Sequence, residues 1–187
     1  MAEVIAGMTM SLDGFVADRD GSAGRLYPDF DELADSDVMR STIDETGAVL
    51  MGRRTFEMAG DTDSYADTYE LQVPIFVLTH RPPEAMPKQN DRLTFTFVTG
   101  DVASAVAQAK AAAADRDVTV VGGADVILQL LQAGLVDVLS IDVMPVFLGE
   151  GLRLFDDPVL EGIGIETIAV DRVGQRITTR FRVLNDT

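Results

Sequence analysis

Arginine, glycine and hydroxyl residues gather at two points where short apolar stretches of the sequence end. Gly52-Arg53-Arg54-Thr55 follows the stretch Ala48–Met51, and His80-Arg81 follows the stretch Pro74–Thr79. A guanidinium group binds phosphate oxygens through paired hydrogen bonds, and the free N–H groups at the start of a helix favour anions. Glycine in addition allows the backbone to approach a ligand closely. We expect the two strand ends to lie near each other, so these residue types predict a phosphate site.

A third apolar stretch, Val118–Val121, ends in Gly122-Gly123-Ala124. Small residues before a helix suit a pyrophosphate that lies against amide hydrogens. Each motif also has a plainer interpretation. A Gly-Gly pair is typical of a tight turn, Arg53-Arg54 fits a solvated pair beside carboxylates, and His80 fits a turn cap. Three strand ends of this kind in one chain favour a nucleotide or dinucleotide phosphate site.

The charge balance of the chain is strongly acidic. Its 187 residues include 15 Lys and Arg against 31 Asp and Glu, a formal net charge of −16. Such a surface repels nucleic-acid phosphates and anionic lipid headgroups, so we expect no nucleic acid and no membrane as a partner. An anion site in this chain must therefore be a local basic cluster, which the strand ends supply.

The chain has no Cys and only one His. This composition excludes thiolate catalysis, Cys-containing zinc sites and the H-E-x-x-H zinc motif, so we expect no metal. The sequence also lacks the glycine fingerprint of a Rossmann domain after its first strand, and it contains no P-loop. Because there is neither a Cys nor the basic start and apolar run of a secretory signal, we expect a cytoplasmic protein.

We expect a single domain over residues 1–187, because no repeat or linker interrupts the chain. Apolar stretches alternate with helical patterns, which is typical of an α/β fold with a mostly parallel central sheet flanked by helices. The last third has strands without helices between them, and the final pair predicts an antiparallel C-terminal hairpin around residues 173–175. The expected strands are Val4–Leu12, Ala48–Met51, Pro74–Thr79, Thr94–Thr99, Val118–Val121, Val138–Phe147, Ile165–Asp171 and Ile177–Leu184. The expected helices are Asp35–Glu45, Gly52–Met58, Val102–Ala114 and Gly123–Ala133, and Asp18–Asp31 is expected to be a loop. Asp101 is expected to cap the third helix, because its side chain can accept hydrogen bonds from the free amides of the first turn.

Five motifs occur along the chain in a fixed order: 10–14 (MSLDG), 51–57 (MGRRTFE), 78–81 (LTHR), 120–125 (VVGGAD) and 145–151 (PVFLGEG). Together they resemble the reductase domain of bifunctional riboflavin-biosynthesis enzymes, which belongs to the dihydrofolate-reductase-like superfamily. The resemblance implies a dihydrofolate-reductase-like fold and an NADPH-dependent reductase. It also implies a homodimer, for which the apolar segment Val143–Leu148 is either the contact surface or a buried strand.

The resemblance further implies which residues bind NADPH. On the side of the adenosine 2′-phosphate and its ribose these are Gly52, Arg53, Arg54, Thr55, Thr79, His80 and Arg81. On the pyrophosphate side they are Gly122, Gly123, Ala124 and Asp125. The arginine cluster agrees with the charge argument, because only NADPH brings an extra phosphate to that place.

Asp13 and Glu150 are the catalytic candidates. Asp13 is suited to bind an amino or hydroxyl group of a ring, or to form a turn with Gly14. Glu150, between two glycines, either reaches a cleft or keeps the loop soluble. Dihydrofolate reductases use a carboxylate on the first helix, for which the candidates are Asp31, Glu32, Asp35 and Asp37.

The substrate implied is a pterin, a pyrimidine, a compound similar to a flavin precursor, or a carbonyl compound. The alternative function is a non-catalytic nucleotide-binding module of the same fold, which keeps the phosphate site without a clear acid near the nicotinamide.

Overall fold

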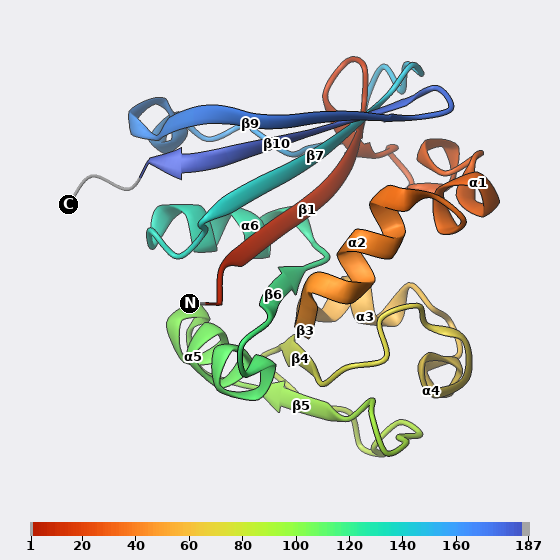
Figure 1. The fold of residues 1–187 in the computed structure, drawn as a ribbon, viewed down its shortest axis with the longest axis vertical. Helices are drawn as coiled ribbons and strands as arrows, with labels where there is room; N and C mark the ends of the chain where they lie inside the picture. The colour runs from red at the N-terminus through yellow and green to blue at the C-terminus, as the bar shows by residue number, and fades with distance from the viewer. Residues whose placement is uncertain (1, 185–187) are drawn as a thin grey trace. The chain divides into compact units, whose positions relative to one another are not determined.

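The computed structural model describes residues 2–184 and has the order of elements of an α/β fold (Figure 1). The strands are β1 (Val4–Ser11), β2 (Phe15–Ala17), β3 (Thr46–Gly52), β4 (Ile75–Leu78), β5 (Phe95–Val98), β6 (Asp117–Val120), β7 (Val138–Met144), β8 (Leu152–Arg153), β9 (Gly164–Val173) and β10 (Arg176–Leu184). The α-helices are α1 (Phe30–Ala34), α2 (Asp37–Glu45), α3 (Arg53–Glu57), α4 (Tyr65–Thr68), α5 (Val102–Ala113) and α6 (Ala124–Gln132). Short 3-10 helices occupy Gly24–Leu26, Thr62–Ser64 and Pro158–Gly162.

Contacts along the chain define two compact units. Residues 2–6 and 45–136 form the first unit, and residues 7–44 and 137–184 form the second, so that β1 contributes to both. Hydrogen bonds order the main strands β5-β4-β3-β6-β1-β7-β10-β9, while β2 and β8 form a separate pair. The single domain expected from the sequence stays a prediction.

A parallel sheet forms the centre of the first unit. In it β6 pairs with β1 and β3, and β4 pairs with β3 and β5. Strand β3 is buried along its whole length, with Ala48–Met51 at most 1% exposed. A strand covered on both faces needs a continuous apolar run rather than an alternating one, which is the pattern that predicted it.

Helix α5 packs against β3, β4 and β6. It begins after Asp101, whose Oδ1 accepts a hydrogen bond from the Ser104 amide at 2.8 Å, as the sequence predicted. The inward face of the helix carries small residues, including the buried Ala105 and Ala109. Such side chains allow the helix to lie close to the sheet.

The second unit ends in antiparallel strands. β10 pairs with β7 on one side and with β9 on the other, and Gly174 forms the turn of the β9–β10 hairpin with a φ of +55° (Figure 1). A positive φ strains most residues but not glycine. The predicted combination of a mostly parallel sheet with an antiparallel C-terminal hairpin is therefore confirmed, and strand β9 is longer than predicted.

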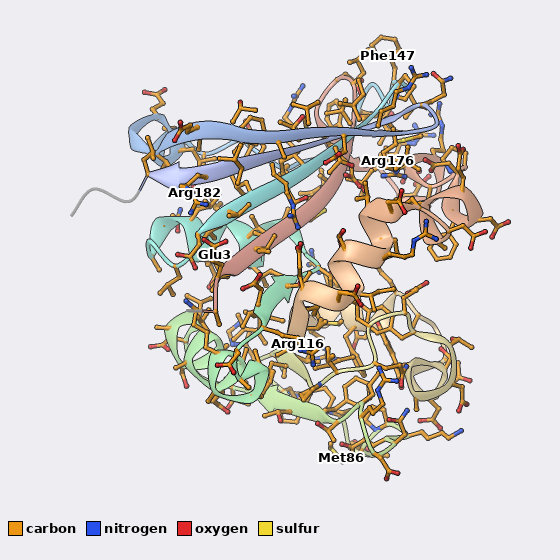
Figure 2. All side chains as sticks on the ribbon, viewed as in Figure 1. Glu3, Met86, Arg116, Phe147, Arg176 and Arg182 are labelled. Carbon is orange, nitrogen blue, oxygen red and sulfur yellow. The ribbon has the colours of Figure 1, made fainter. Side chains whose placement is uncertain are left out.

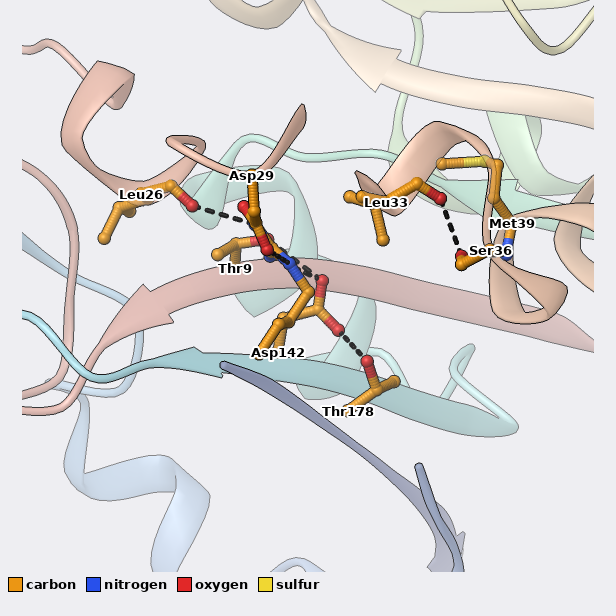
Figure 3. Close-up of polar contacts among 9 residues, drawn as sticks. Thr9, Leu26, Asp29, Leu33, Ser36, Met39, Asp142 and Thr178 are labelled. Atoms are coloured by element: carbon orange, nitrogen blue, oxygen red, sulfur yellow. Dashed lines mark hydrogen bonds and ion pairs between the residues drawn. The ribbon is translucent and has the colours of Figure 1, made fainter. Parts of the chain in front are cut away.

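Several short elements differ from the predictions. The expected loop Asp18–Asp31 contains a 3-10 turn and the start of α1, and β2, α4 and β8 were not predicted. Helix α2 starts at Asp37 rather than Asp35, because the Ser36 hydroxyl accepts a hydrogen bond from the Met39 amide at 3.1 Å. The same hydroxyl donates to the Leu33 carbonyl at 2.6 Å (Figure 3).

A buried arginine organises the second unit. Arg176 is 0% exposed, and its guanidinium donates to both oxygens of Asp29 at 3.1 and 2.8 Å and to Asp142 at 3.0 Å. Its remaining hydrogen bonds go to the Thr9 hydroxyl and the Leu26 carbonyl, both at 2.9 Å. Figure 3 shows these partners around one point, with Thr178 donating to Asp142 at 2.6 Å.

The network joins distant parts of the sequence, because its members come from β1, β7, β10 and the segment before α1. The guanidinium lowers the pKa of Asp29, which it contacts through both oxygens. All five N–H groups of the guanidinium thus have acceptors, as a buried charge requires.

Among the described residues, no helix is long and apolar enough to cross a membrane.

We predict that Arg176→Met lowers the free energy of unfolding at pH 7 by about 3–5 kcal/mol, because it leaves two carboxylates without their counter-charge. The pKa of Asp29 is lowered in the folded state, so its contribution is present above pH ~4 and is lost as the pH falls through the folded pKa. The difference between wild type and variant should therefore shrink below pH ~4. Urea denaturation of the wild type and the variant, at pH 7 and below pH ~4, measures this difference in the free energy of unfolding.

Arg182→Met on the same strand is the control, because Arg182 is exposed whereas Arg176 is not (Figure 2). We expect a loss of less than about 1 kcal/mol. Equal losses for the two variants would contradict the structural role of Arg176.

Candidate functional site

The ends of β3 and β4 lie beside each other in the first unit. Their parallel register pairs Met51 with Val77 and Gly52 with Leu78. The residues that follow, Arg53 and Thr79, therefore leave the sheet at the same edge. The expectation that these two strand ends are neighbours is confirmed.

A pocket lies between the two strand ends. It is lined by Arg53, Phe56, Glu57, Thr79, Arg81, Pro83 and Phe97. Two arginines thus line one pocket together with a threonine, a glutamate and three apolar residues. Arginine and threonine side chains are of the types that bind phosphate oxygens.

Arg53 and Glu57 form an ion pair across one turn of α3. The Nε of Arg53 donates to Oε1 of Glu57 at 2.7 Å, and each side chain is 51% exposed. The hydrogen bond engages the Nε and leaves other N–H groups of the guanidinium for a ligand. In the described part of the chain, Arg81 has no carboxylate partner.

Thr79 fixes the turn that presents Arg81. Its hydroxyl accepts a hydrogen bond from the Arg81 amide at 3.2 Å and donates to the Arg81 carbonyl at 2.9 Å. Thr79 is 7% exposed, so its hydroxyl serves the backbone of the turn as well as the wall of the pocket. Arg54 and His80 are exposed and are not among the residues that line the pocket.

The end of β6 contacts the end of β3 directly. The Gly52 amide donates to the Gly122 carbonyl at 3.0 Å, and the peptide bond between Gly122 and Gly123 is cis. A Cβ on Gly52 would lie 3.0 Å from the Val126 side chain, and a Cβ on Gly123 would lie 3.4 Å from the Thr55 hydroxyl. Glycine at these positions allows the start of α3 to lie against the start of α6.

Helix α6 begins at Ala124 after Gly123, and no side chain caps its first turn. Its first N–H groups therefore lack intrahelical acceptors and can bind an anion. The Asp125 carboxylate accepts a hydrogen bond from Gln129 at 2.8 Å. Because a carboxylate repels phosphate, any part of Asp125 in binding a pyrophosphate would come from its backbone amide.

Asp13 lies in the second unit, where its carboxylate joins two loops. It accepts hydrogen bonds from the Ser11 hydroxyl at 2.6 Å, the Leu148 amide at 3.1 Å and the Gly149 amide at 2.8 Å. The hydrogen bond from Ser11, followed by those from the two amides, lowers the pKa of Asp13 to about 2. Gly14 next to it has a φ of +86° and forms the predicted turn.

Glu150 is an exposed residue of the same loop. Its side chain is 67% exposed and accepts from Arg19 Nη1 at 3.3 Å. Among the first-helix carboxylates, Asp31 and Glu32 lie on α1, whereas Asp37 begins α2 and pairs with Arg40. The catalytic roles of Asp13 and Glu150 stay predictions, as do the roles of the cofactor-binding candidates.

Sequence reasoning missed four of the residues that line the pocket, namely Phe56, Glu57, Pro83 and Phe97. Glu57 had a detectable signal, because it lies four residues after Arg53 in a predicted helix and i,i+4 side chains meet. Phe97 reaches the pocket from β5 through tertiary packing, for which the sequence carries no local signal.

Known proteins resemble this chain along most of its length. The uncharacterized protein YyaP of Bacillus subtilis (strain 168) is 24% identical over 157 residues, which cover 82% of this chain and 80% of YyaP. Among solved structures, a protein of Shewanella sp. PV-4 named for riboflavin biosynthesis is 22% identical with a TM-score of 0.76, and the match covers 99% of this chain and 100% of that one.

A second solved structure is a diaminohydroxyphosphoribosylaminopyrimidine deaminase/5-amino-6-(5-phosphoribosylamino)uracil reductase from Thermotoga maritima. It is 18% identical with a TM-score of 0.65, and the match covers 97% of this chain but 56% of that one. These likenesses confirm the dihydrofolate-reductase-like fold. Since the model of the RibD C-terminal domain matches residues 2–179, the chain belongs to the RibD C-terminal domain family.

Proposed function

We propose that this protein is an NADPH-dependent reductase that transfers a hydride to a small heterocyclic substrate of the pyrimidine or pterin type, or to a related carbonyl compound. The observation that carries the proposal is the pocket in which Arg53 and Arg81 stand together at two strand ends. The family is the second support, because the Thermotoga maritima relative is a reductase of a substituted uracil.

The physical argument concerns the extra phosphate of NADPH. A 2′-phosphate carries nearly two negative charges, and a chain with net charge −16 repels it at most of its surface. Two guanidinium groups in one pocket reverse the local sign and match the phosphate geometry. NADH has a hydroxyl at that place and gains much less from them.

The remaining cofactor contacts follow from the neighbouring strand end. The free N–H groups at the start of α6 would hold the pyrophosphate, and the glycines before it leave room for the backbone to approach. The nicotinamide ring supplies the hydride when NADPH is bound. The residues of this chain bind and orient the cofactor.

Asp13 supports a positioning role rather than a proton-donating one. With a pKa of about 2 its carboxyl group is ionised at neutral pH and accepts three hydrogen bonds. This observation favours retaining the second candidate function, the nucleotide-binding module. Such a module has no proton donor, so it binds the nucleotide but does not catalyse hydride transfer. Oxidation of bound NADPH on addition of a ribitylamino-pyrimidinone or dihydrofolate supports the reductase, and binding without oxidation of any such substrate supports the module.

We expect the wild type to bind NADPH more tightly than NADH. Arg81→Ala should raise the dissociation constant of NADPH about 10- to 100-fold, the value of one lost charge-assisted hydrogen-bonded contact, and change that of NADH by less than about 3-fold. Fluorescence titration or calorimetry at fixed ionic strength measures both constants.

Arg116→Ala is the matched control, because this exposed arginine precedes β6 at the opposite end of the parallel strands (Figure 2). It should leave both constants unchanged. Unchanged NADPH affinity in Arg81→Ala would contradict the proposed phosphate site.

Asp13→Asn should release the loop that contains Leu148 and Gly149. The neutral amide lacks the second acceptor oxygen, so we expect faster hydrogen exchange at these two backbone amides. Exchange followed by mass spectrometry or NMR tests this. Glu150→Gln in the same loop is the control and should leave exchange unchanged, because Glu150 is exposed and its carboxylate pairs with the side chain of Arg19. Exchange at these two amides that is as slow in Asp13→Asn as in the wild type would contradict the anchoring role of Asp13.

We also propose that the protein is a homodimer that uses exposed apolar residues of the second unit. Within the predicted segment Val143–Leu148, Met144 is buried at the end of β7, whereas Phe147 is 66% exposed (Figure 2). Light scattering after gel filtration should give about twice the chain mass of 20.2 kDa, and Phe147→Asp should shift it toward the monomer. Met86→Asp, an exposed position of the first unit, should not. A monomeric wild type would refute this proposal.

A further inference from the structure

The pocket at the ends of β3 and β4 contains one carboxylate among its lining residues, that of Glu57. Glu57 and Arg53 form an ion pair at 2.7 Å on the exposed face of a five-residue helix. An exposed i,i+4 pair of this kind contributes little to stability, because water screens the charges and two long side chains must be ordered. The position of Glu57 is therefore not explained by the fold.

A carboxylate in this place has two effects on a ligand. Its charge repels a phosphate that approaches Arg53 and Arg81, and its oxygens can accept a hydrogen bond from a ribose hydroxyl. In dinucleotide sites, an acidic residue against the ribose 2′-hydroxyl favours NADH, while arginine favours the 2′-phosphate of NADPH. This pocket contains both kinds of group.

We propose that Glu57 is a specificity-determining residue that limits the preference of this protein for NADPH over NADH. The inference rests on the proposed function, since it concerns the same pocket. The Arg81 guanidinium is available to bind the phosphate, because Arg81 has no carboxylate partner among residues 2–184. Arg53 is shared between Glu57 and the ligand, so the carboxylate offsets part of the positive charge that a phosphate would meet.

An opposite role for Glu57 predicts the opposite result. If the carboxylate mainly serves to position the Arg53 guanidinium for phosphate binding, its removal weakens NADPH binding. Glu57→Gln separates the two roles, because the amide oxygen can still accept the hydrogen bond from Arg53 Nε while the negative charge is gone. Glu57→Ala removes both the charge and the hydrogen bond.

The experiment measures dissociation constants for NADPH and NADH, and for the minimal probes 2′,5′-ADP and 5′-AMP, in wild type and both variants. We expect Glu57→Gln to tighten NADPH and 2′,5′-ADP about tenfold, as one unit charge acts on a nearly doubly charged phosphate in a partly hydrated pocket. NADH and 5′-AMP should bind equally or more weakly. The gain should shrink at high salt, because salt screens an exposed charge.

Asp115→Asn is the matched control, since it removes one exposed carboxylate before β6, at the opposite end of the strands. It should change the ratio of the NADH and NADPH constants by less than about twofold. We expect Glu57→Gln to raise the dissociation constant of NADH divided by that of NADPH. If this ratio is unchanged or lower while the wild type binds NADPH tightly, this inference alone is overturned. A wild type that binds neither dinucleotide overturns the proposed function and this inference with it.

Discussion

The hydrogen-bond register of three parallel strands is the constraint on which the candidate site depends. β4, β3 and β6 pair so that Gly52 lies beside Leu78 and donates to the Gly122 carbonyl. Parallel strands all end at one edge, where their loops pass into helices. Gly52 and Gly122, which are far apart in the sequence, therefore meet and hydrogen-bond at this edge. A shift of one residue in the register of a strand would turn all its side chains to the other face and separate the groups that line the pocket.

Burial decides what the arginines of this chain do. Arg176 is fully buried, and two carboxylates, a hydroxyl and a carbonyl take all its N–H groups, so it holds the second unit together and has no capacity for a ligand. Arg53 and Arg81 lie at an open strand edge, where at most one carboxylate competes for them. The same side chain is structural when its acceptors are internal and is available for an anion when they are not.

The sequence predicted the parts of the fold that local patterns determine. The buried run of β3, the Asp101 cap of α5 and the C-terminal hairpin all have signals within a few residues, and the structure confirms them. The sequence could not predict α1 or the pair β2–β8. These elements are too short to form alone and depend on tertiary contacts such as that between Asp29 and Arg176. For the site, the sequence identified the strand ends and both pocket arginines, but not the walls that Phe97 and Pro83 provide from other segments.

Asp13 illustrates why residue type alone does not assign a catalytic role. A carboxylate beside a glycine turn is equally suited to bind a substrate and to bind the backbone, and only its acceptors distinguish the two. Here a hydroxyl and two amides from the loop that contains Gly149 stabilise the anion and lower its pKa to about 2. A general acid needs a pKa near the working pH, because it must hold its proton before the reaction and release it during the reaction. The contacts that make Asp13 a strong anchor for the loop are therefore the contacts that make it a poor proton donor.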